Sequence, residues 1–232
     1  MTTMPLRKHT AVLADYLPQA GRRILDVGCG EGALVRHFAR NGAEAVGIDP
    51  LAQAIERAEA AEPVPGTSFV LGRGEALPFP DADFDIVCYF NSLHHVPQAV
   101  MGQALGEALR VARPEAMIAV LEPVAAGAYF EMMRPINDET EVREQAIAAL
   151  ADFATRPGVR LLEQIDYDSP HSYESFAACE ERVLSVDPTR AARLAQHRDE
   201  IAASFAATSE RDEKGRYLFR QPSRLALFAK ED

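Results

Sequence analysis

Short apolar runs alternate with helix-like stretches along the first half of the chain. The runs read, in order, RRILDV, AEAVGI, TSFVL, FDIVCYF and MIAVL. Each is almost continuously apolar rather than alternating, which is typical of strands buried on both faces of a parallel sheet. Helix-like stretches separate several of them, at residues 31–40, 51–61 and 98–112. This succession of strands and helices predicts a doubly wound α/β fold.

The second half of the chain has a different texture. Residues 125–158 and 172–212 are rich in Ala, Glu and Arg with few β-branched side chains, which predicts helices. Between them VRLLEQIDY predicts a strand, and SRLALFAK predicts another at the end, one of the two at the sheet edge. We therefore predict a Rossmann-like, mostly parallel seven-stranded sheet with helices on both faces. The helices of the second half are expected to cover the active site at the carboxyl ends of the strands.

Length and composition suit a single domain. The chain has 232 residues, 47% of them hydrophobic, which is ample material for one large core. We expect one domain over residues 1–232. Its expected parts are an N-terminal helical lid at 1–20, a cofactor-binding core at 21–124, a helical substrate-covering region with one strand at 125–215, and a C-terminal strand at 216–232.

The charge balance and the cysteines bear on partners and compartment. Asp and Glu number 35 against 24 Lys and Arg, so the net charge is −11 at pH 7. An acidic surface repels phosphate backbones, so we expect no nucleic-acid partner. Cys29, Cys88 and Cys179 are far apart and odd in number, which favours neither a disulfide framework nor a metal site of ligand spacing. They are typical of free thiols in a reducing cytoplasm.

No stretch of the chain is typical of a segment that enters a membrane. The N-terminal MTTMPLRKHT lacks the apolar core of a secretory leader. The most apolar stretch, MIAVLEPVAAGAYF, is interrupted by Glu122 and Pro123 and is too short to span a bilayer. We therefore expect a soluble, cytoplasmic protein without a membrane partner, and we leave its oligomeric state open.

The strongest local feature is a glycine-rich turn in ILDVGCGEGALVRHFA, residues 24–39. Its glycines allow a sharp turn and a close approach of the backbone to a ligand, with a helix N-terminus behind it. The next apolar run ends in Gly47-Ile48-Asp49-Pro50. An acidic residue at the tip of a second strand meets the hydroxyls of a nucleoside ribose, and the Asp49 carboxylate can accept both protons.

Glycine spacing alone leaves the ligand open. Gly28, Gly30 and Ala33 fit the dinucleotide pattern G-x-G-x-x-G/A, which is a weak signal and also fits a tight turn without a ligand. Asp26, inside the first strand, is unfavourable beside a pyrophosphate and suits a ligand with an ammonium group. A third segment, LGRGEALPF at 71–79, follows the third strand and offers backbone N–H groups to an adenine edge.

From Ile24 to Val124 the chain resembles the class I S-adenosylmethionine (SAM)-dependent methyltransferases, particularly the type 11 group that includes the ubiquinone and menaquinone C-methyltransferases. ILDVGCGEG, GIDP, EALPFPDADFDIV and LHHV carry the resemblance by their order and spacing. It implies SAM as the cofactor, S-adenosylhomocysteine as its product, and methyl transfer as the reaction. The other half of the chain matches no motif, so the resemblance says little about the acceptor.

The resemblance also implies a cofactor site built from four segments of the chain. Backbone atoms of the glycine-rich turn contact the methionine part, an acidic residue lies near its amino group, and other segments reach the ribose, the adenine and the sulfonium. The residues implied for these contacts are Gly28, Cys29 and Gly30 for methionine, Asp26 for its amino group, Asp49 for the ribose, Pro50, Gly74, Glu75 and Ala76 for the adenine, and Asn91 and Ser92 for the sulfonium.

Two positions depart from the family pattern. Arg73 stands where family members usually carry an Asp that accepts from the adenine amino group, two residues before Glu75. An arginine cannot accept, so that contact comes from elsewhere or is missing. At 113–116 the sequence RPEA replaces the family's Lys-Pro-Gly-Gly, a change that we expect to affect only the turn.

Catalytic residues are harder to assign. Methyl transfer is an in-line displacement, so orientation supplies much of its rate, and a base is needed only when the acceptor loses a proton. His94 and His95 follow the fourth strand; either is a candidate base or orienting group, or alternatively His95 caps the next helix and His94 lines the pocket. Glu122 either polarises the acceptor or pairs with an arginine. Because adjacent histidines are expected to point apart, we predict no metal site.

The leading hypothesis is a SAM-dependent methyltransferase with a small-molecule acceptor. A catalytically inactive, methyltransferase-like module that serves a partner enzyme is the alternative, suggested by Arg73. A nicotinamide-dependent oxidoreductase would need a catalytic Tyr/Lys or His/Asp pair after the fourth strand, and YFNSLHHV offers none. RNA is disfavoured as an acceptor by the net charge of −11.

Overall fold

The computed structural model describes residues 4–231, so the first three residues of the predicted lid lie outside the described residues. The chain divides into two compact units. Unit 1 takes the chain up to His9, Pro123–Glu141 and Asp166–Ser223. Unit 2 takes Thr10–Glu122, Val142–Ile165 and the chain from Arg224 onward. All the predicted cofactor and catalytic residues lie in unit 2.

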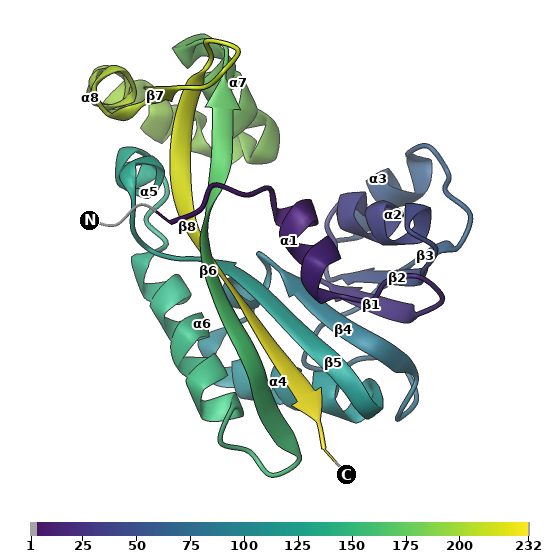
Figure 1. The fold of residues 1–232 in the computed structure, drawn as a ribbon. Helices are drawn as coiled ribbons and strands as arrows, with labels where there is room; N and C mark the ends of the chain where they lie inside the picture. Colours follow the sequence, from purple (N-terminus) through teal and green to yellow (C-terminus); the bar gives the residue numbers. More distant parts are fainter. Residues whose placement is uncertain (1–3, 232) are drawn as a thin grey trace. The chain divides into compact units, whose positions relative to one another are not determined.

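One sheet of eight strands has the order β3-β2-β1-β4-β5-β8-β6, with the short β7 paired to β8 (Figure 1). The strands are β1 Arg23–Val27, β2 Glu44–Asp49, β3 Thr67–Leu71, β4 Phe84–Phe90, β5 Ala112–Pro123, β6 Val159–Tyr173, β7 Glu210–Arg211 and β8 Tyr217–Lys230. From β3 to β5 all neighbours are parallel, and β7 pairs antiparallel with β8. The mostly parallel, doubly wound sheet is confirmed, with β7 added to the seven predicted strands.

Helices lie on both faces of the sheet in unit 2. The chain moves from β1 to β3 in one direction along the sheet and from β4 to β5 in the other, so right-handed crossovers place α2 and α3 opposite α4 (Figure 1). The helices are α1 His9–Tyr16, α2 Ala33–Arg40, α3 Ala52–Ala60, the 3₁₀ turn η1 Leu93–His95, α4 Gln98–Val111, α5 Ala128–Met133, α6 Thr140–Phe153, α7 Phe176–Val186, the 3₁₀ turn η2 Pro188–Arg190 and α8 Ala191–Thr208.

One apolar core of unit 2 lies between the sheet and the helices on its α4 side. Met101, Leu105 and Ala108 form the buried face of α4, at the helical spacing of four and three residues. They belong to one apolar cluster with Leu150 and Phe153 of α6 and with inward-facing strand residues. Burial of this face fixes α4 on the sheet. From this fixed position α4 contacts the loop at residues 73–81.

Several predicted boundaries differ from the structure. The strand TSFVL was expected to be buried on both faces, but β3 is an edge strand, and the Leu71 side chain at its end is 56% exposed. Residues 172–212 were expected to be helical throughout, whereas β6 continues to Tyr173 and α7 begins only after Ser175. The Ser175 hydroxyl caps α7 by accepting from the Ala178 N–H at 3.2 Å. β8 likewise begins at Tyr217, earlier than the predicted SRLALFAK.

Unit 1 has a core of its own, rich in aromatic and sulfur-containing side chains. Phe205 of α8 lies at its centre, 5.1 Å from Phe219 and 6.3 Å from Tyr173 between ring centroids. The Tyr129 and Tyr173 hydroxyls are 2.9 Å apart, and burial raises the pKa of both. Met132, Met133 and Cys179 belong to the same cluster. These contacts give the helices of unit 1 a packed interior that the sequence motifs did not predict.

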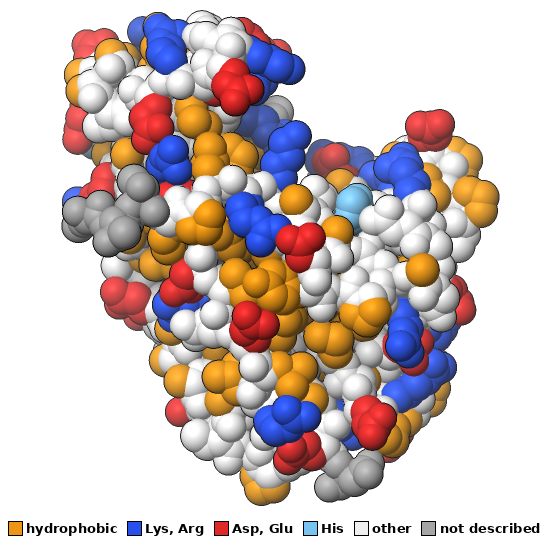
Figure 2. Space-filling view, in the orientation of Figure 1, with side chains coloured by type: hydrophobic (Ala, Val, Ile, Leu, Met, Phe, Trp, Pro, Cys, Tyr) orange, Lys and Arg blue, Asp and Glu red, His pale blue; other side chains and the backbone are white. Residues whose placement is uncertain are grey.

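The surface shows both signs of charge. Figure 2 shows Lys and Arg side chains interspersed with Asp and Glu on the face in view. The three cysteines are free and buried. Among the described residues no helix is long and apolar enough to cross a membrane.

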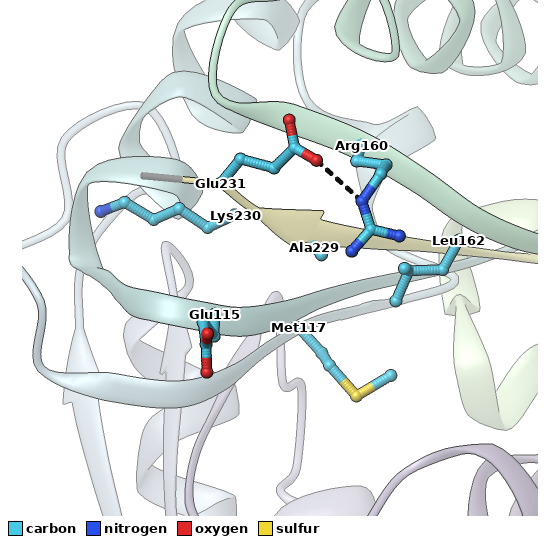
Figure 3. Close-up of a pocket in the computed structure, with 7 residues that line it drawn as sticks. All are labelled: Glu115, Met117, Arg160, Leu162, Ala229, Lys230 and Glu231. Atoms are coloured by element: carbon cyan, nitrogen blue, oxygen red, sulfur yellow. Dashed lines mark hydrogen bonds and ion pairs between the residues drawn. The ribbon is translucent and has the colours of Figure 1, made fainter.

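A pocket of about 430 Å³ in unit 2 lies at the start of β5, where the sequence departs from the family pattern (Figure 3). Glu115 has a φ of +62°, in the left-handed region where glycine is favoured. Here the chain adopts this conformation with a glutamate, inside β5. Across the pocket, Arg160 donates to Glu231 at 2.7 Å.

Candidate functional site

The glycine-rich turn joins β1 to α2 and is pinned to the end of β2. The Gly28 and Cys29 N–H groups both donate to the Ile48 carbonyl, at 2.8 and 3.0 Å. Gly28 has a φ of +78°, and a Cβ added there would lie 2.5 Å from the Cβ of Ser92. Only glycine satisfies both conditions at this position, so the turn requires the residue that the sequence places there.

Gly47 is a residue of the site that sequence reasoning did not assign. A Cβ added to it would lie 2.7 Å from the Cys29 sulfur and 2.8 Å from a methyl carbon of Val35. β2 can therefore pass close beneath the glycine-rich turn only without a side chain at this point. Burial raises the pKa of the Cys29 thiol, so the sulfur stays neutral and serves as packing. The signal for Gly47 was its place in the motif GIDP.

Asp49 ends β2 beside the glycine-rich turn, with its side chain almost fully buried. Its Oδ2 accepts from the Gly30 N–H and its Oδ1 from the Leu51 N–H, both at 2.9 Å. A carboxylate oxygen has two lone pairs, so each oxygen keeps one acceptor position. Asp49 thus holds the turn in shape and still has capacity for two hydroxyl protons.

Asp26 is a buried carboxylate with an open acceptor. Its side chain is 2% exposed, and its Oδ1 has no hydrogen-bond partner among residues 4–231. Burial, and then the charge of Asp49, raise its pKa to about 7. A buried carboxylate in this state gains stability when a positive group is brought next to it. The pair Asp26 and Asp49 therefore fits a ligand that carries both an ammonium group and vicinal hydroxyls.

The end of β4 offers a second open acceptor. Asn91 has a φ of +51°, its N–H donates to the Leu121 carbonyl at 2.8 Å, and its Oδ1 is buried without a partner in the described part of the chain. Ser92, next to it, donates its hydroxyl proton to the Val27 carbonyl at 2.5 Å. Ser92 thereby ties the end of β4 to the end of β1, where the glycine-rich turn begins.

The loop after β3 carries three of the four residues assigned to adenine, Gly74, Glu75 and Ala76. A Cβ added to Gly74 would lie 3.0 Å from a methyl carbon of Val27, so the loop approaches the end of β1 closely. Arg73 points outward, with its side chain 69% exposed and its Nη1 3.7 Å from Glu75 Oε1. The side chain of Glu75 is only 18% exposed. The departure at Arg73 therefore lies on the surface side of the loop.

Glu122 and His94 form a buried pair that sequence reasoning did not connect. Glu122, the next-to-last residue of β5, is 2% exposed, and His94 in η1 is 4% exposed. One carboxylate oxygen of Glu122 accepts from the Ser92 and Leu93 N–H groups at 3.1 and 2.8 Å, and the other contacts His94 Nδ1. Glu122 is thus paired with a histidine and two backbone amides, rather than with an arginine as one alternative supposed.

His95 lies beside His94 rather than turned away from it. The two ring centroids are 4.0 Å apart at an angle of 47°, and His95 is exposed whereas His94 is buried. The expectation that adjacent histidines point apart is therefore wrong here, because the tight 3₁₀ turn η1 brings the two rings together.

Comparison with known proteins agrees with this geometry. Residues 25–120 match the methyltransferase domain family of type 11. The chain is 31% identical over 116 residues to an uncharacterized methyltransferase of Synechocystis sp., covering 50% of this chain and 54% of that protein. It is 36% identical over 125 residues to the 27-O-demethylrifamycin SV methyltransferase of Amycolatopsis mediterranei, covering 50% and 45%. Among solved structures, a putative methyltransferase of Bacillus halodurans has a TM-score of 0.66 at 19% identity, covering 97% of this chain and 99% of that one.

These matches differ in what they establish. The family match confirms the resemblance that the motifs predicted, and it covers the β1-to-β5 segment that contains the glycine-rich turn. The likeness to the Bacillus halodurans structure confirms the fold over almost the whole chain. The chain spans about half the length of the curated relatives it matches.

Proposed function

We propose, from the premise that residues 25–120 match the methyltransferase domain family, that the protein transfers a methyl group from SAM to a small-molecule acceptor. The observation that carries the proposal is the Asp26 carboxylate, buried beside the glycine-rich turn with an oxygen that lacks a partner among residues 4–231. The cofactor class that this family uses carries an ammonium group, a ribose and no phosphate, and the acidic pair Asp26 and Asp49 suits that combination.

The residues that would hold SAM come from four segments of unit 2. When bound, SAM supplies an electrophilic methyl group on a positively charged sulfonium. Asp26 and the glycine-rich turn would receive the methionine part, Asp49 the ribose hydroxyls, and the loop after β3 the adenine. The predicted residues not yet named in this role are Gly28, Cys29, Gly30, Pro50, Gly74, Glu75, Ala76, Asn91 and Ser92.

In this proposal, His94 accepts or orients the acceptor proton, and Glu122 positions His94. The Glu122 carboxylate contacts Nδ1 of His94, which favours the tautomer with the proton on Nδ1 and the lone pair on Nε2. A histidine in that tautomer accepts a proton from a hydroxyl group or orients it. Glu122 would be a positioning residue, because its oxygens are occupied by His94 and by the backbone amides of Ser92 and Leu93.

The acceptor is proposed to be a small molecule. One relative is named for its action on 27-O-demethylrifamycin SV. A net charge of −11 opposes the approach of a nucleic-acid backbone. Neither point identifies the acceptor, so the first experiment addresses the cofactor.

Thermal unfolding with S-adenosylhomocysteine, and in parallel with NADH and NADPH, tests the proposal. A ligand at about a hundred times its Kd stabilises by roughly 2.7 kcal/mol, which for a chain of this size is about 5–10 °C in Tm. We expect this shift with S-adenosylhomocysteine and none with the nicotinamide cofactors. A Tm shift with NADH alone would reject SAM as the cofactor. The absence of a Tm shift with every one of the three ligands would reject it as well.

A further inference from the structure

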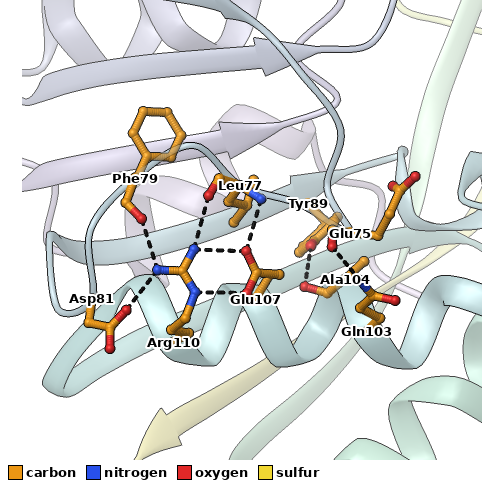
Figure 4. A network of polar contacts seen from close by, with 9 residues as sticks. All are labelled: Glu75, Leu77, Phe79, Asp81, Tyr89, Gln103, Ala104, Glu107 and Arg110. Carbon is orange, nitrogen blue, oxygen red and sulfur yellow. Dashed lines mark hydrogen bonds and ion pairs between the residues drawn. The ribbon is translucent and has the colours of Figure 1, made fainter.

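The loop that would face the adenine is held by α4. This loop, residues 73–81, connects β3 to β4 and forms no strand pairing with the rest of the sheet. Three polar side chains of α4, Gln103, Glu107 and Arg110, face it (Figure 4). Their spacing of four and three residues places them on one face of the helix. The opposite face of α4 is the buried apolar one, so the helix is itself fixed.

Arg110 is the centre of these contacts, because all five N–H donors of its guanidinium have acceptors. Two donors reach backbone carbonyls of the loop, those of Leu77 at 2.9 Å and Phe79 at 2.8 Å. A third reaches Asp81 at 2.8 Å. The other two form a fork with the Glu107 carboxylate, at 2.7 and 2.8 Å. A planar guanidinium with every donor used allows little movement of the loop.

Glu107 and Gln103 hold the same loop at further points. Glu107 Oε2 accepts from the Leu77 N–H at 2.9 Å, so Leu77 is held at both its N–H and its carbonyl. The hydrogen bonds from Arg110 lower the pKa of Glu107, which keeps its carboxylate ionised. Gln103 donates from Nε2 to the Glu75 carbonyl at 2.8 Å. The anchored residues thus extend from Glu75, an expected adenine contact, to Asp81.

We propose that Gln103, Glu107 and Arg110 form a clamp that holds the 73–81 loop in its ligand-binding conformation before the nucleoside end of the cofactor arrives. This inference rests on the proposed function. The three are positioning residues, because they bind the loop rather than the ligand. A loop that is already ordered loses less conformational entropy on binding, so the clamp raises affinity for any ligand that carries the nucleoside.

The chain offers a matched control for Arg110. Arg113 lies three residues further along, also in unit 2, and its side chain is 43% exposed against 31% for Arg110. It donates at 2.9 Å to Asp85, an acceptor in β4 outside the 73–81 loop. Arg113→Met therefore removes a charged hydrogen bond from the same region without touching the loop, whereas Arg110→Met removes the clamp.

Titration calorimetry with two ligands separates the clamp from a general loss of stability. S-adenosylhomocysteine carries the nucleoside and the amino acid, whereas 5′-methylthioadenosine carries the nucleoside without the ammonium group. We expect Arg110→Met to weaken both by the same factor, about tenfold. Asp26→Asn should weaken the binding of S-adenosylhomocysteine but not that of 5′-methylthioadenosine. Arg113→Met should leave the affinity for both ligands unchanged. Equal affinities in Arg110→Met and Arg113→Met, or a loss confined to S-adenosylhomocysteine, would overturn the clamp. If the wild-type protein bound neither ligand, the proposed function itself would fail.

Hydrogen exchange and a conservative variant complete the test. In Arg110→Met the amides of Glu75, Ala76, Leu77 and Phe79 should exchange faster than in the wild type, while Arg113→Met leaves them unchanged. Arg110→Lys should not restore affinity, because an ammonium has three donors on one atom and cannot reach two carbonyls and two carboxylates together. Full recovery in Arg110→Lys, or unchanged exchange in Arg110→Met, would contradict a clamp made by the guanidinium.

Discussion

Two polar clusters of unit 2 differ in how completely their groups are paired. Around Arg110 every guanidinium donor has an acceptor, and the result is a loop held in place. Around the glycine-rich turn, Asp26 and Asn91 each keep a buried oxygen without a partner among residues 4–231. A fully paired cluster stabilises the fold, whereas an unpaired acceptor costs free energy until a ligand supplies the donor. The difference separates the support of the site from the site itself.

The largest effect on this contrast is expected from Asp26→Asn. The variant removes the carboxylate that would meet the ammonium group, so the Tm shift with S-adenosylhomocysteine should disappear. In the free protein, Asp26→Asn should raise stability at pH 8, because it removes a buried charge next to Asp49.

The pH dependence of Asp26 has a definite sign. Its pKa rises from 3.8 to about 7 on folding, so the folded state binds the proton more tightly. The contribution of Asp26 to stability is complete below about pH 4 and is lost as the pH rises to about 7. The gain of Asp26→Asn over wild type should therefore appear in thermal unfolding at pH 8 and be small at pH 5. Two results for Asp26→Asn would contradict these predictions: normal binding of S-adenosylhomocysteine, or lower stability than the wild type at pH 8.

Asp49→Ala should also abolish binding, but with the opposite effect on stability. Removing this carboxylate leaves the Gly30 and Leu51 N–H groups without their acceptor, at a cost of about 1–3 kcal/mol. Chemical unfolding and calorimetry with S-adenosylhomocysteine measure the two effects. Glu56→Ala, at an exposed residue of α3 outside the site, is the control. Unchanged affinity in Asp49→Ala would exclude Asp49 as the ribose ligand.

A subtler change is expected from Glu122→Gln. The amide keeps an oxygen for the Ser92 and Leu93 N–H groups but no longer provides a carboxylate for Nδ1 of His94. We expect the His94 ring to lose its preference for the Nδ1–H tautomer, while S-adenosylhomocysteine still binds. Nitrogen-15 NMR of the imidazole reports the tautomer directly. The same Nδ1–H tautomer in wild type and variant would show that Glu122 does not set it.

The smallest effect concerns Glu115, which lies in β5. Glu115 holds a left-handed φ of +62°, a strain that glycine relieves. Relief of this strain in Glu115→Gly should stabilise the protein by about 1 kcal/mol. Part of this gain is offset, because glycine has more conformational entropy in the unfolded chain. Urea unfolding measures the gain, and the affinity for S-adenosylhomocysteine should not change. Lower stability would show that the Glu115 side chain has a role of its own at the pocket beside it.

The sequence predicted much more of the cluster around the glycine-rich turn than of the cluster around Arg110. Asp26 and the glycine-rich turn were found from a short stretch, because a polar residue inside an apolar run and closely spaced glycines are local signals. The roles of Glu107 and Arg110 were not found, since their partners lie about 30 residues away and two of them are backbone carbonyls. Backbone acceptors carry no side-chain signature, so no reading of residue types would reveal them.

The sequence by itself determined the doubly wound sheet and the resemblance to the methyltransferase domain family, because each depends on periodicity or on motifs within a few tens of residues. The cofactor residues that this resemblance implies stay a prediction. Only the tertiary structure decided that Glu122 pairs with His94, 28 residues away, and that α4 holds the 73–81 loop. It also decided that the carboxylate of Asp26 is buried beside that of Asp49. These depend on which strands and helices become neighbours, and that order is set by the packing of the whole sheet rather than by any one segment.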